Sequence, residues 1–188
     1  MENNQSFLLW LDLETTGLQP EKHHIIEIAT ILTDFNLKII AEGPEIAIHQ
    51  PDEVFQTMSD WSAQQHQLSG LLNQVKKSTI DLSEAENQTL YFVQAYCQPQ
   101  TTFLAGNSIH FDRQFLYTHM PKLTAYLSYR LVDVSSIKEL AKRWYPQQVP
   151  PSKKQTHRSL DDLRESIAEL QFYKDNIFIK WKQAVFII

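Results

Sequence analysis

The sequence predicts an α/β domain in which a mixed β-sheet carries helices on its faces. Two observations predict this class. Three apolar, strand-like segments follow one another in the first part of the chain, and helical segments then alternate with short strands. The 188 residues suit one domain, and a hydrophobic fraction of 43% is ordinary for a globular protein. We expect a single domain over residues 1–188, with its core at about 7–174 and an apolar tail at 178–188.

Five apolar segments are expected to form the sheet. A Gly/Pro turn at residues 17–20 separates the first from the second, and a tight turn at 34–36 separates the second from the third. Strands joined so closely predict a three-strand antiparallel meander. The five expected strands are residues 7–13, 25–33, 37–48, 102–105 and 129–134.

The helices are indicated by apolar residues at helical spacing and by residues that stop helices. In the longest helical segment such residues recur from Leu82 to Tyr96, and Pro121 and Pro146 are expected to end two others. Residues 146–156 are rich in Pro, Lys and Gln, which predicts a mobile loop. The expected helices are residues 59–68, 81–97, 112–120, 135–144 and 160–173.

Charge and composition narrow the functional classes. The formal net charge is −5, whereas proteins that hold long nucleic acids through their phosphates are usually basic. A short anionic substrate, or one bridged by metal ions, remains open. The single cysteine, Cys97, permits no internal disulfide, and the polar start MENNQS shows no export signal. Because the apolar stretch FIKWKQAVFII is also shorter than the ~20 residues that span a bilayer, we expect a cytoplasmic protein.

Two carboxylates interrupt the first apolar segment, which reads LLWLDLETTGL. Asp12 and Glu14 are two residues apart on a strand, so they project from the same face. Two negative charges so close, in a partly desolvated place, require a proton or a cation between them. Carboxylate oxygens favour Mg²⁺ or Mn²⁺. The alternative, which is commoner for an isolated D-x-E, is that both side chains are solvated where the strand ends.

Further acidic residues stand at the starts of two expected helices. Asp112, in GNSIHFDRQFL, follows a short strand, and an isolated Asp there usually complements the helix dipole. His157, Asp161 and Asp162 stand at the entry to the last helix, where acidic residues are common and a lone His is usually structural. Both aspartates lie outside the buried stripe of this helix, so helical geometry does not decide which one faces the first strand.

Taken in order, Asp12-x-Glu14, Asp112, and His157 with Asp162 resemble the motif set of the DEDDh 3′-to-5′ exonucleases. The match extends from residue 7 to about 174. Within that superfamily the chain is similar to the oligoribonuclease family, on the stretches WLDLETTGL, IIEIATILTD, AEGPEIAIHQ, GNSI, YRLVDVSSIKELAKRW and DDLRESIAEL. Two positions differ from that family: Thr15-Thr16 replaces Met-Thr, and His110-Phe111 replaces Gly-Gln. Both are closer to proofreading exonucleases.

The resemblance implies a ribonuclease-H-like fold, in which a mixed five-stranded sheet combines the meander with two parallel strands. It implies that Asp12, Glu14, Asp112 and Asp162 hold two divalent ions, Mg²⁺ or Mn²⁺. His157 would be the general base. Asp161 would be either solvated or in contact with the metal ligands without binding an ion itself. The implied activity is 3′-to-5′ hydrolysis of very short RNA, dinucleotides especially, to 5′-mononucleotides.

The resemblance also implies a tight substrate pocket shared between the subunits of a homodimer. In it Leu18 would wedge between two bases, while Trp61 and His66 would line the pocket by stacking and polar contact. Ser108 and Arg130 would hold the 5′ phosphate, and Tyr129 would reach in from the partner chain. Each has a simpler alternative. Trp61 could belong to the core, and Tyr129 and Arg130 could be ordinary residues of a half-buried strand.

Two other functions remain open at this stage. The Thr15-Thr16 and Phe111 differences suit a proofreading-type 3′-to-5′ DNA exonuclease. A catalytically silent nucleic-acid-binding or scaffold domain could share the fold, although such a module has no need of all five motif residues.

Overall fold

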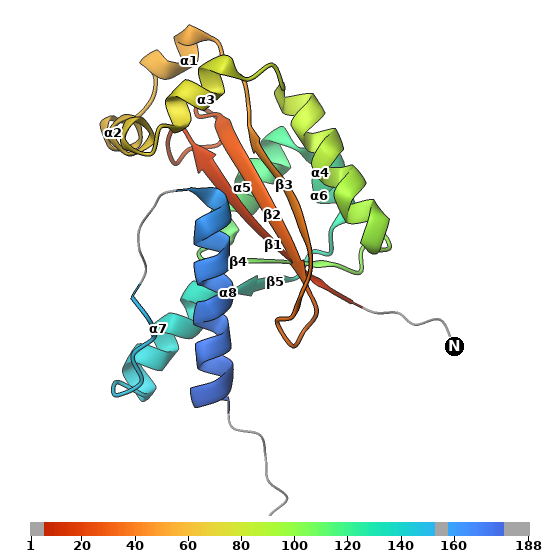
Figure 1. Ribbon diagram of the computed structural model, residues 1–188, viewed down its shortest axis with the longest axis vertical. Helices are drawn as coiled ribbons and strands as arrows, with labels where there is room; N and C mark the ends of the chain where they lie inside the picture. Colours follow the sequence, from red (N-terminus) through yellow and green to blue (C-terminus); the bar gives the residue numbers. More distant parts are fainter. Residues whose placement is uncertain (1–5, 153–157, 179–188) are drawn as a thin grey trace, which may run out of the picture.

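The computed structural model describes residues 6–152 and 158–178, which form the expected mixed sheet with helices around it (Figure 1). The five strands lie in the order β3-β2-β1-β4-β5. β2 is antiparallel to both β1 and β3, whereas β4 is parallel to β1 and β5 is parallel to β4. The strands are β1 (Leu8–Thr15), β2 (Ile25–Thr33), β3 (Ile39–Ala47), β4 (Phe103–Gly106) and β5 (Leu131–Asp133). The predicted fold class is therefore confirmed.

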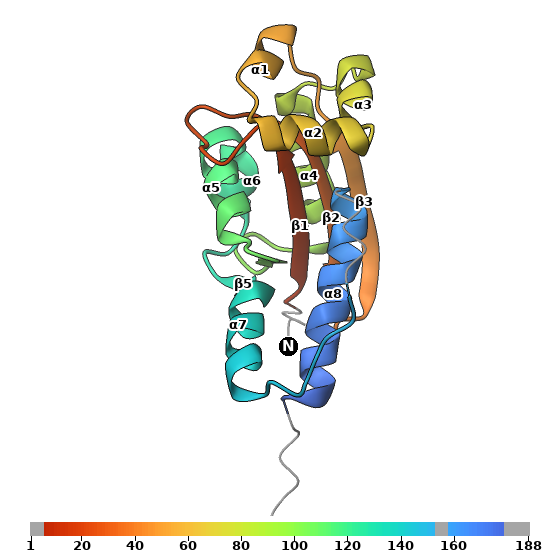
Figure 2. The same ribbon diagram turned by 90° about the vertical axis from the view of Figure 1, so that its left-hand side faces the viewer.

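Helices cover both faces of the sheet and one of its ends (Figures 1 and 2). One face packs against α4 (Leu82–Tyr96), α5 (His110–His119) and α6 (Pro121–Tyr126). The other face packs against α7 (Val134–Trp144) and α8 (Ser159–Asn176). At the end where β1 stops lie α1 (Asp52–Gln56), α2 (Asp60–Leu68) and α3 (Leu71–Lys77). None of the helices in the described residues is both long and apolar enough to cross a membrane.

The alternation of side chains along β1 divides the core into two layers. Leu9 and Leu11 are buried in the layer beneath α4, α5 and α6, and Leu8 and Trp10 are buried in the layer beneath α7 and α8. Because successive side chains of a strand point to opposite faces, Asp12 continues the row of Leu8 and Trp10. The two carboxylates of β1 thus lie on the face that α8 covers.

The structure differs from the sequence-based expectations mainly in short elements. α1, α3 and α6 were not expected, and Pro121 begins α6 as its first residue, where its missing N–H costs nothing. The last strand is shorter than expected, because Val134 already begins α7 and the Asp133 side chain accepts a hydrogen bond from the Ser135 N–H. β1 extends to Thr15, so both carboxylates stand within a strand and not in a frayed loop.

Candidate active site

The parallel strands β1, β4 and β5 end at the same edge of the sheet, and polar residues follow each of them. In open α/β sheets, ligands bind at the carboxyl ends of such strands. Figure 2 faces this edge: β1 runs between α5 and α8, and α2 crosses its upper end. The candidate site is assembled from these four elements and from the loops that follow β1 and β4.

Three carboxylates converge at this edge. Asp12 and Glu14 come from β1 and Asp162 comes from the first turn of α8, and one oxygen of each lies within 4.8 Å of the others. Their oxygens are hard donors of the kind that Mg²⁺ and Mn²⁺ prefer. The donor set therefore fits a divalent cation, and the structure brings together residues about 150 positions apart in the sequence.

A fourth carboxylate is attached to the same strand through the backbone. Asp112 stands in the first turn of α5, and its Oδ1 accepts a hydrogen bond of 3.0 Å from the N–H of Leu13. Leu13 lies between Asp12 and Glu14, so this bond fixes Asp112 beside both of them. We call these four residues the carboxylate centre: Asp12, Glu14, Asp112 and Asp162.

Burial and mutual repulsion both act on the carboxylate centre. Burial, and then the charges of the neighbouring carboxylates, raise the pKa of Asp12 well above its ordinary value, although a hydrogen bond from Ser159 partly opposes this. Burial, followed by the charge of Glu27, raises the pKa of Glu14 to about 8. Burial also raises the pKa of Asp112 to about 7, against the effect of the Leu13 N–H. The cause of these shifts, negative charges held close together in a buried site, is one that bound cations would relieve.

The start of α8 is held in place by a buried glutamate that the sequence analysis did not identify. Glu27, on β2, pairs across the sheet with Glu14 and is 0% exposed. Its Oε1 accepts a hydrogen bond of 3.0 Å from the guanidinium of Arg158, and its Oε2 accepts one of 3.2 Å from the Ser159 N–H. These bonds place the first turn of α8, and with it Asp162, against β1. An acidic residue inside the apolar run IIEIATILT was the available signal.

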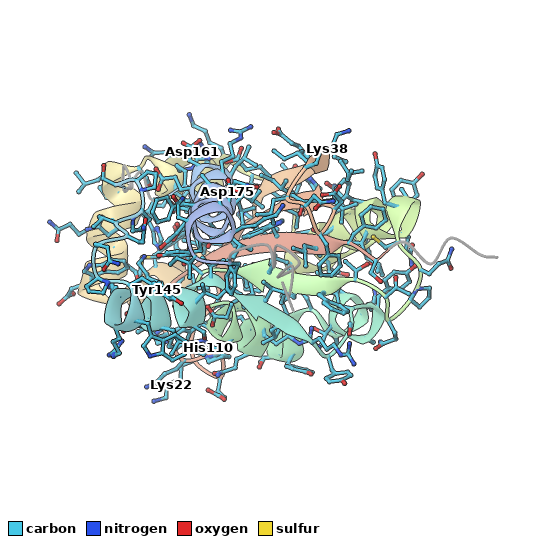
Figure 3. The ribbon with its side chains drawn as sticks, turned by 90° about the horizontal axis from the view of Figure 1, so that it is seen from below. Lys22, Lys38, His110, Tyr145, Asp161 and Asp175 are labelled. Carbon is cyan, nitrogen blue, oxygen red and sulfur yellow. The ribbon has the colours of Figure 1, made fainter. Side chains whose placement is uncertain are left out.

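The first turn of α8 contains two aspartates, and the structure places their side chains in different environments. Asp161 has a side chain that is 53% exposed and lies 3.6 Å from Arg164, on the outside of α8. Figure 3 shows Asp161 on the side of the molecule away from His110. Asp162 is the one that joins the carboxylate centre. The expected general base, His157, lies outside the described residues.

The helix α2 carries two of the expected substrate residues in different environments. The side chain of Trp61 is 61% exposed, so it does not belong to the core. His66 is only 1% exposed, and its Nε2 lies 2.9 Å from the carbonyl oxygen of Thr15. The Nδ1 of His66 lies 3.7 Å from Oε2 of Glu14. In this structure His66, on α2, thus contacts both the carboxylate centre and the end of β1.

A groove opens next to the carboxylate centre. It is lined by Asp12 and Asp112 together with Leu18, Ser108 and Phe111, among others. Leu18 is 72% exposed, on the loop that connects β1 to β2. The groove therefore places two expected substrate residues beside two of the acidic residues. Phe111 was noted in the sequence only as a difference from the family, and no role was assigned to it.

The Leu18 loop is attached to α5. The Nε2 of His119, at the end of α5, lies 2.8 Å from the carbonyl oxygen of Pro20, and the ring of His119 stacks on Phe115. The ring of His23 covers Gly17 so closely that a Cβ atom there would lie 2.5 Å from it. Both contacts restrict the loop that presents Leu18.

The side chain of Asp133 bonds to residues in the segment that follows β4. Its Oδ1 accepts hydrogen bonds from the Ser108 N–H at 3.0 Å and from the Ser135 N–H at 2.9 Å, while its Oδ2 lies 3.3 Å from Nδ1 of His110. Ser108 has a φ of 52°, in the left-handed region that few residues other than glycine adopt. The bond to Asp133 helps to stabilise that conformation. Asp133 was not singled out from the sequence, because two of its partners, Ser108 and His110, are distant in sequence and lie in the loop and helix that follow β4.

The remaining two expected substrate residues precede β5. Tyr129 is 74% exposed, and the guanidinium carbon of Arg130 lies 5.6 Å from its ring centroid and 5.7 Å from that of Phe103. In the register of β4 and β5, Leu131 pairs with Leu104 and Asp133 pairs with Gly106. Arg130 therefore precedes β5, whereas Ser108 follows β4 at the other end of this pair of strands.

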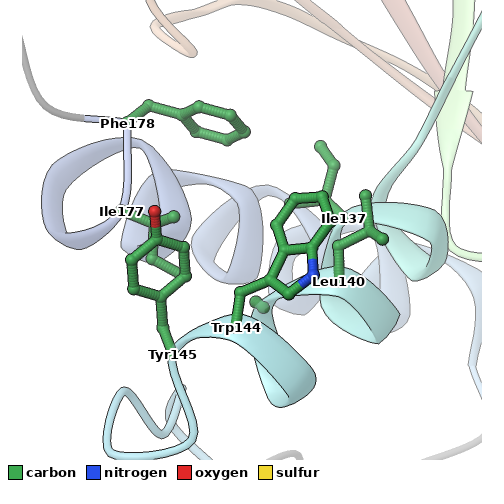
Figure 4. A pocket seen from close by; sticks show the side chains of 7 residues that line it. Ile137, Leu140, Trp144, Tyr145, Ile177 and Phe178 are labelled. Carbon is green, nitrogen blue, oxygen red and sulfur yellow. The ribbon is translucent and has the colours of Figure 1, made fainter.

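A second hollow lies between α7 and the end of α8, away from the carboxylate centre (Figure 4). Trp144 and Leu140 of α7 form one side of it, and Ile177 and Phe178 form the other. Its lining is apolar, and the Trp144 side chain is 65% exposed. Phe178 is the first residue of the expected apolar tail, and the rest of that tail, residues 179–188, lies outside the described residues.

Comparison with known proteins relates this site to nucleases. The family model described as an exonuclease family, RNase T, matches residues 9–170. An oligoribonuclease of Pseudomonas paraeruginosa is 53% identical over 181 residues, which is 96% of this chain and 99% of that protein. The human mitochondrial oligoribonuclease is 51% identical over 175 residues, which is 92% of this chain and 74% of that protein.

Solved structures of exonuclease I share the fold. Escherichia coli exonuclease I in complex with a 5cy-dT13 oligonucleotide aligns with a TM-score of 0.69 at 16% identity, over 92% of this chain and 41% of that chain. The enzyme from Methylocaldum szegediense aligns with a TM-score of 0.68 at 19% identity, over 92% and 41% of the two chains. The chain thus spans about two-fifths of these larger proteins, and at such identity the likeness concerns the ribonuclease-H-like exonuclease fold alone.

Proposed function

The chain belongs to the exonuclease family, in its oligoribonuclease branch, and we propose that it is a 3′-to-5′ exoribonuclease that acts mainly on dinucleotides and releases 5′-mononucleotides. One exonuclease domain would account for residues 1–188. The observation that carries this proposal is the convergence of Asp12, Glu14 and Asp162 within 4.8 Å. A domain that only bound nucleic acid would gain nothing from gathering these charges.

We propose that the carboxylate centre holds two divalent ions, Mg²⁺ or Mn²⁺. When bound, such ions neutralise the scissile phosphate and stabilise the attacking and leaving oxygens of an in-line displacement. The raised pKa values support this assignment, since they arise from burial and mutual repulsion of the carboxylates, and bound cations would offset that repulsion. The bond from the Leu13 N–H to Asp112 and the Glu27 contacts at the start of α8 would keep all four carboxylates oriented.

His157 is proposed as the general base that takes a proton from the attacking water. An unperturbed histidine pKa near 6.5 suits that work at neutral pH. Support comes from its neighbours in sequence, because Arg158 and Ser159 are both bonded to Glu27, which pairs with Glu14 in the sheet. Asp161, paired with Arg164 on the outside of α8, is assigned no part in the reaction.

The substrate is proposed to lie in the groove beside the carboxylate centre. Leu18 would wedge between the two bases, with Trp61 and His66 on the α2 side, and Ser108 and Arg130 would bind the 5′ phosphate. Tyr129 would act on the partner subunit of a homodimer, which its 74% exposure permits. A phosphate bound at the second nucleotide would leave no path for a longer strand, and the net charge of −5 offers no basic track for one.

The direct test is a length series. Wild-type protein with Mg²⁺ or Mn²⁺ is incubated with labelled RNAs of about two to twenty nucleotides, and the rates are compared with those of Asp162→Asn and Asp161→Asn. We expect dinucleotides to be hydrolysed much faster than the longest RNAs. We expect Asp162→Asn to lose at least ~10³-fold in rate, since removing a catalytic group typically costs that much. Asp161→Asn, the matched neighbour, should remain active. Equal rates at all lengths would contradict a groove that is closed beyond the second nucleotide.

A second candidate, a proofreading-type DNA exonuclease, is favoured by the exposed Phe111 in the groove and by Thr15-Thr16. Faster removal of mismatched DNA 3′ ends than of diribonucleotides would support it. A silent binding domain would hydrolyse neither, and Asp162→Asn would leave its binding unchanged. The proposed location is the cytoplasm, supported by the free, buried thiol of Cys97, whereas the human relative is named mitochondrial.

A further inference from the structure

An aromatic ring that the proposed function does not use lines the substrate groove. We propose that Phe111 stacks on a base of the bound dinucleotide, opposite the apolar contact of Leu18. This inference rests on the proposed function and adds a residue that binds and selects the substrate. It assigns a role to the position at which the sequence differs from its family.

Burial and position together distinguish Phe111 within α5, because Tyr117 is also exposed, at 59%, but does not line the groove. Phe115 and Leu116 of the same helix are 3% and 0% exposed, as expected for residues that face the core, whereas Phe111 is 43% exposed. Phe111 lines the groove together with Leu18, Asp12 and Asp112. An aromatic side chain at the edge of the groove presents a flat face on which a base can stack.

The ring is supported from one side. His110 lies with its ring centroid 4.4 Å from that of Phe111, at an interplanar angle of 36°. His110 is in turn 3.3 Å from Oδ2 of Asp133, whose Oδ1 accepts the Ser108 N–H. The residue that orients Ser108 therefore also holds the support of Phe111. A ring that is already held in place loses little conformational entropy when a base stacks on it.

The ligand that fits the Phe111 ring is a nucleobase, whether it is attached to ribose or to deoxyribose. Stacking uses the π-face that every base presents, so it tolerates sequence but favours the larger area of a purine. Leu18, on the facing loop, offers a compact apolar surface and no hydrogen-bonding group. We therefore expect Phe111 to contribute more with adenine or guanine than with uracil or cytosine.

The test compares Phe111→Ala, Phe111→Leu and Phe111→Tyr with wild type on diadenylate and diuridylate. Loss of one stacked base is expected to weaken binding about tenfold, which corresponds to about 1.4 kcal/mol. For Phe111→Ala we expect KM for diadenylate to rise about tenfold, with kcat changed less than about threefold, and a smaller rise for diuridylate. Phe111→Tyr, which keeps the ring, should restore most of the affinity, and Phe111→Leu should not. Tyr91→Ala, which removes a 75% exposed aromatic from α4, is the matched control.

Substrates that lack one base separate stacking from a general loss of structure. Two dinucleotides are compared, one abasic at its first position and one abasic at its second. The KM effect of Phe111→Ala should disappear on one of them, and the missing base of that substrate is the stacked base. If the effect persists on both abasic substrates, Phe111 does not contact a base and the inference is overturned. If wild type hydrolyses dinucleotides and Phe111→Ala matches it, the inference alone fails. If wild type hydrolyses none, the proposed function fails.

Discussion

The carboxylate centre and the rim of the groove lie at the same edge of the sheet, yet they are held in different ways. The carboxylates project from β1, α5 and α8 and are fixed by buried contacts such as those of Glu27 with α8. The rim consists of exposed side chains on a loop and at a helix start, among them Leu18 and Phe111. The difference indicates that one chain can form the carboxylate centre by itself, whereas under the proposed function substrate selection would also involve a partner subunit.

The largest effect on the carboxylate centre is expected from removal of the Glu27 side chain. Glu27→Ala leaves the guanidinium of Arg158, whose side chain is only 24% exposed, without its main partner. Loss of one member of a buried ion pair typically costs ~3–5 kcal/mol, and here it also frees the start of α8 and Asp162. We expect a large fall in the free energy of unfolding, measured with urea, and weaker binding of Mn²⁺ measured by calorimetry.

The control for this prediction uses the same arginine. Glu45 also bonds to Arg158, at 3.3 Å, but it is 34% exposed. Glu45→Ala should cost less than about 1 kcal/mol and leave Mn²⁺ affinity unchanged. Similar effects of the two substitutions would show that the position of α8 does not depend on the buried glutamate.

A mixing experiment tests whether the rim is completed by a partner. Asp162→Asn lacks a metal ligand but retains Tyr129, and Tyr129→Ala lacks the tyrosine but retains the metal ligands. If Tyr129 works on the neighbouring subunit, a mixed dimer contains one complete site. Random exchange makes about half of the dimers mixed, so activity on dinucleotides should return to about a quarter of wild type, well above either variant alone.

Two results would contradict the shared site. Sizing chromatography that shows a fully active monomer would exclude any contribution from a partner. A mixture no more active than the sum of its components, with subunit exchange confirmed by a tag on one variant, would place Tyr129 within its own subunit or outside the site.

The metal-free carboxylate centre should make stability depend on pH. In the unfolded chain Glu14 releases its proton near its ordinary value of 4.5, whereas in the folded protein its pKa is about 8, and Asp112 shifts from 3.8 to about 7. Between these values the folded state retains protons that the unfolded state has released, so raising the pH favours unfolding. We expect the Tm in EDTA to be several degrees lower at pH 8 than at pH 5.5.

Two comparisons isolate the cause of this pH effect. Added Mg²⁺ or Mn²⁺ should raise the Tm most at pH 8, because binding requires the ionised carboxylates. Glu14→Gln, which cannot ionise, should show a weaker dependence on pH in EDTA. A Tm that is unchanged or higher at pH 8 would mean that water screens the carboxylates more than their burial suggests.

The part of the site on β1 was predictable from the local sequence pattern, whereas contacts between distant segments were not. The alternation of apolar residues along β1 places Asp12 and Glu14 on one face, and this periodicity is local information. The choice between Asp161 and Asp162 depends on how Glu27 holds α8, and a contact between residues so distant in sequence leaves no periodic signal. Asp133 and the position of Arg130 depend likewise on the register of two short strands.

The smallest expected effect concerns the loop that carries Leu18. His119→Phe keeps a ring to stack on Phe115 but loses the N–H that the carbonyl of Pro20 accepts. A single hydrogen bond contributes ~0.5–1.5 kcal/mol, so we expect KM for a dinucleotide to rise by roughly two- to tenfold with little change in kcat. If His119 acts by placing Leu18, the substitution should raise KM no further in a Leu18→Ala background. His119→Gln, which retains an N–H donor, should lie closer to wild type. An equal effect of His119→Phe in both backgrounds would mean that His119 affects KM by a route other than the placement of Leu18.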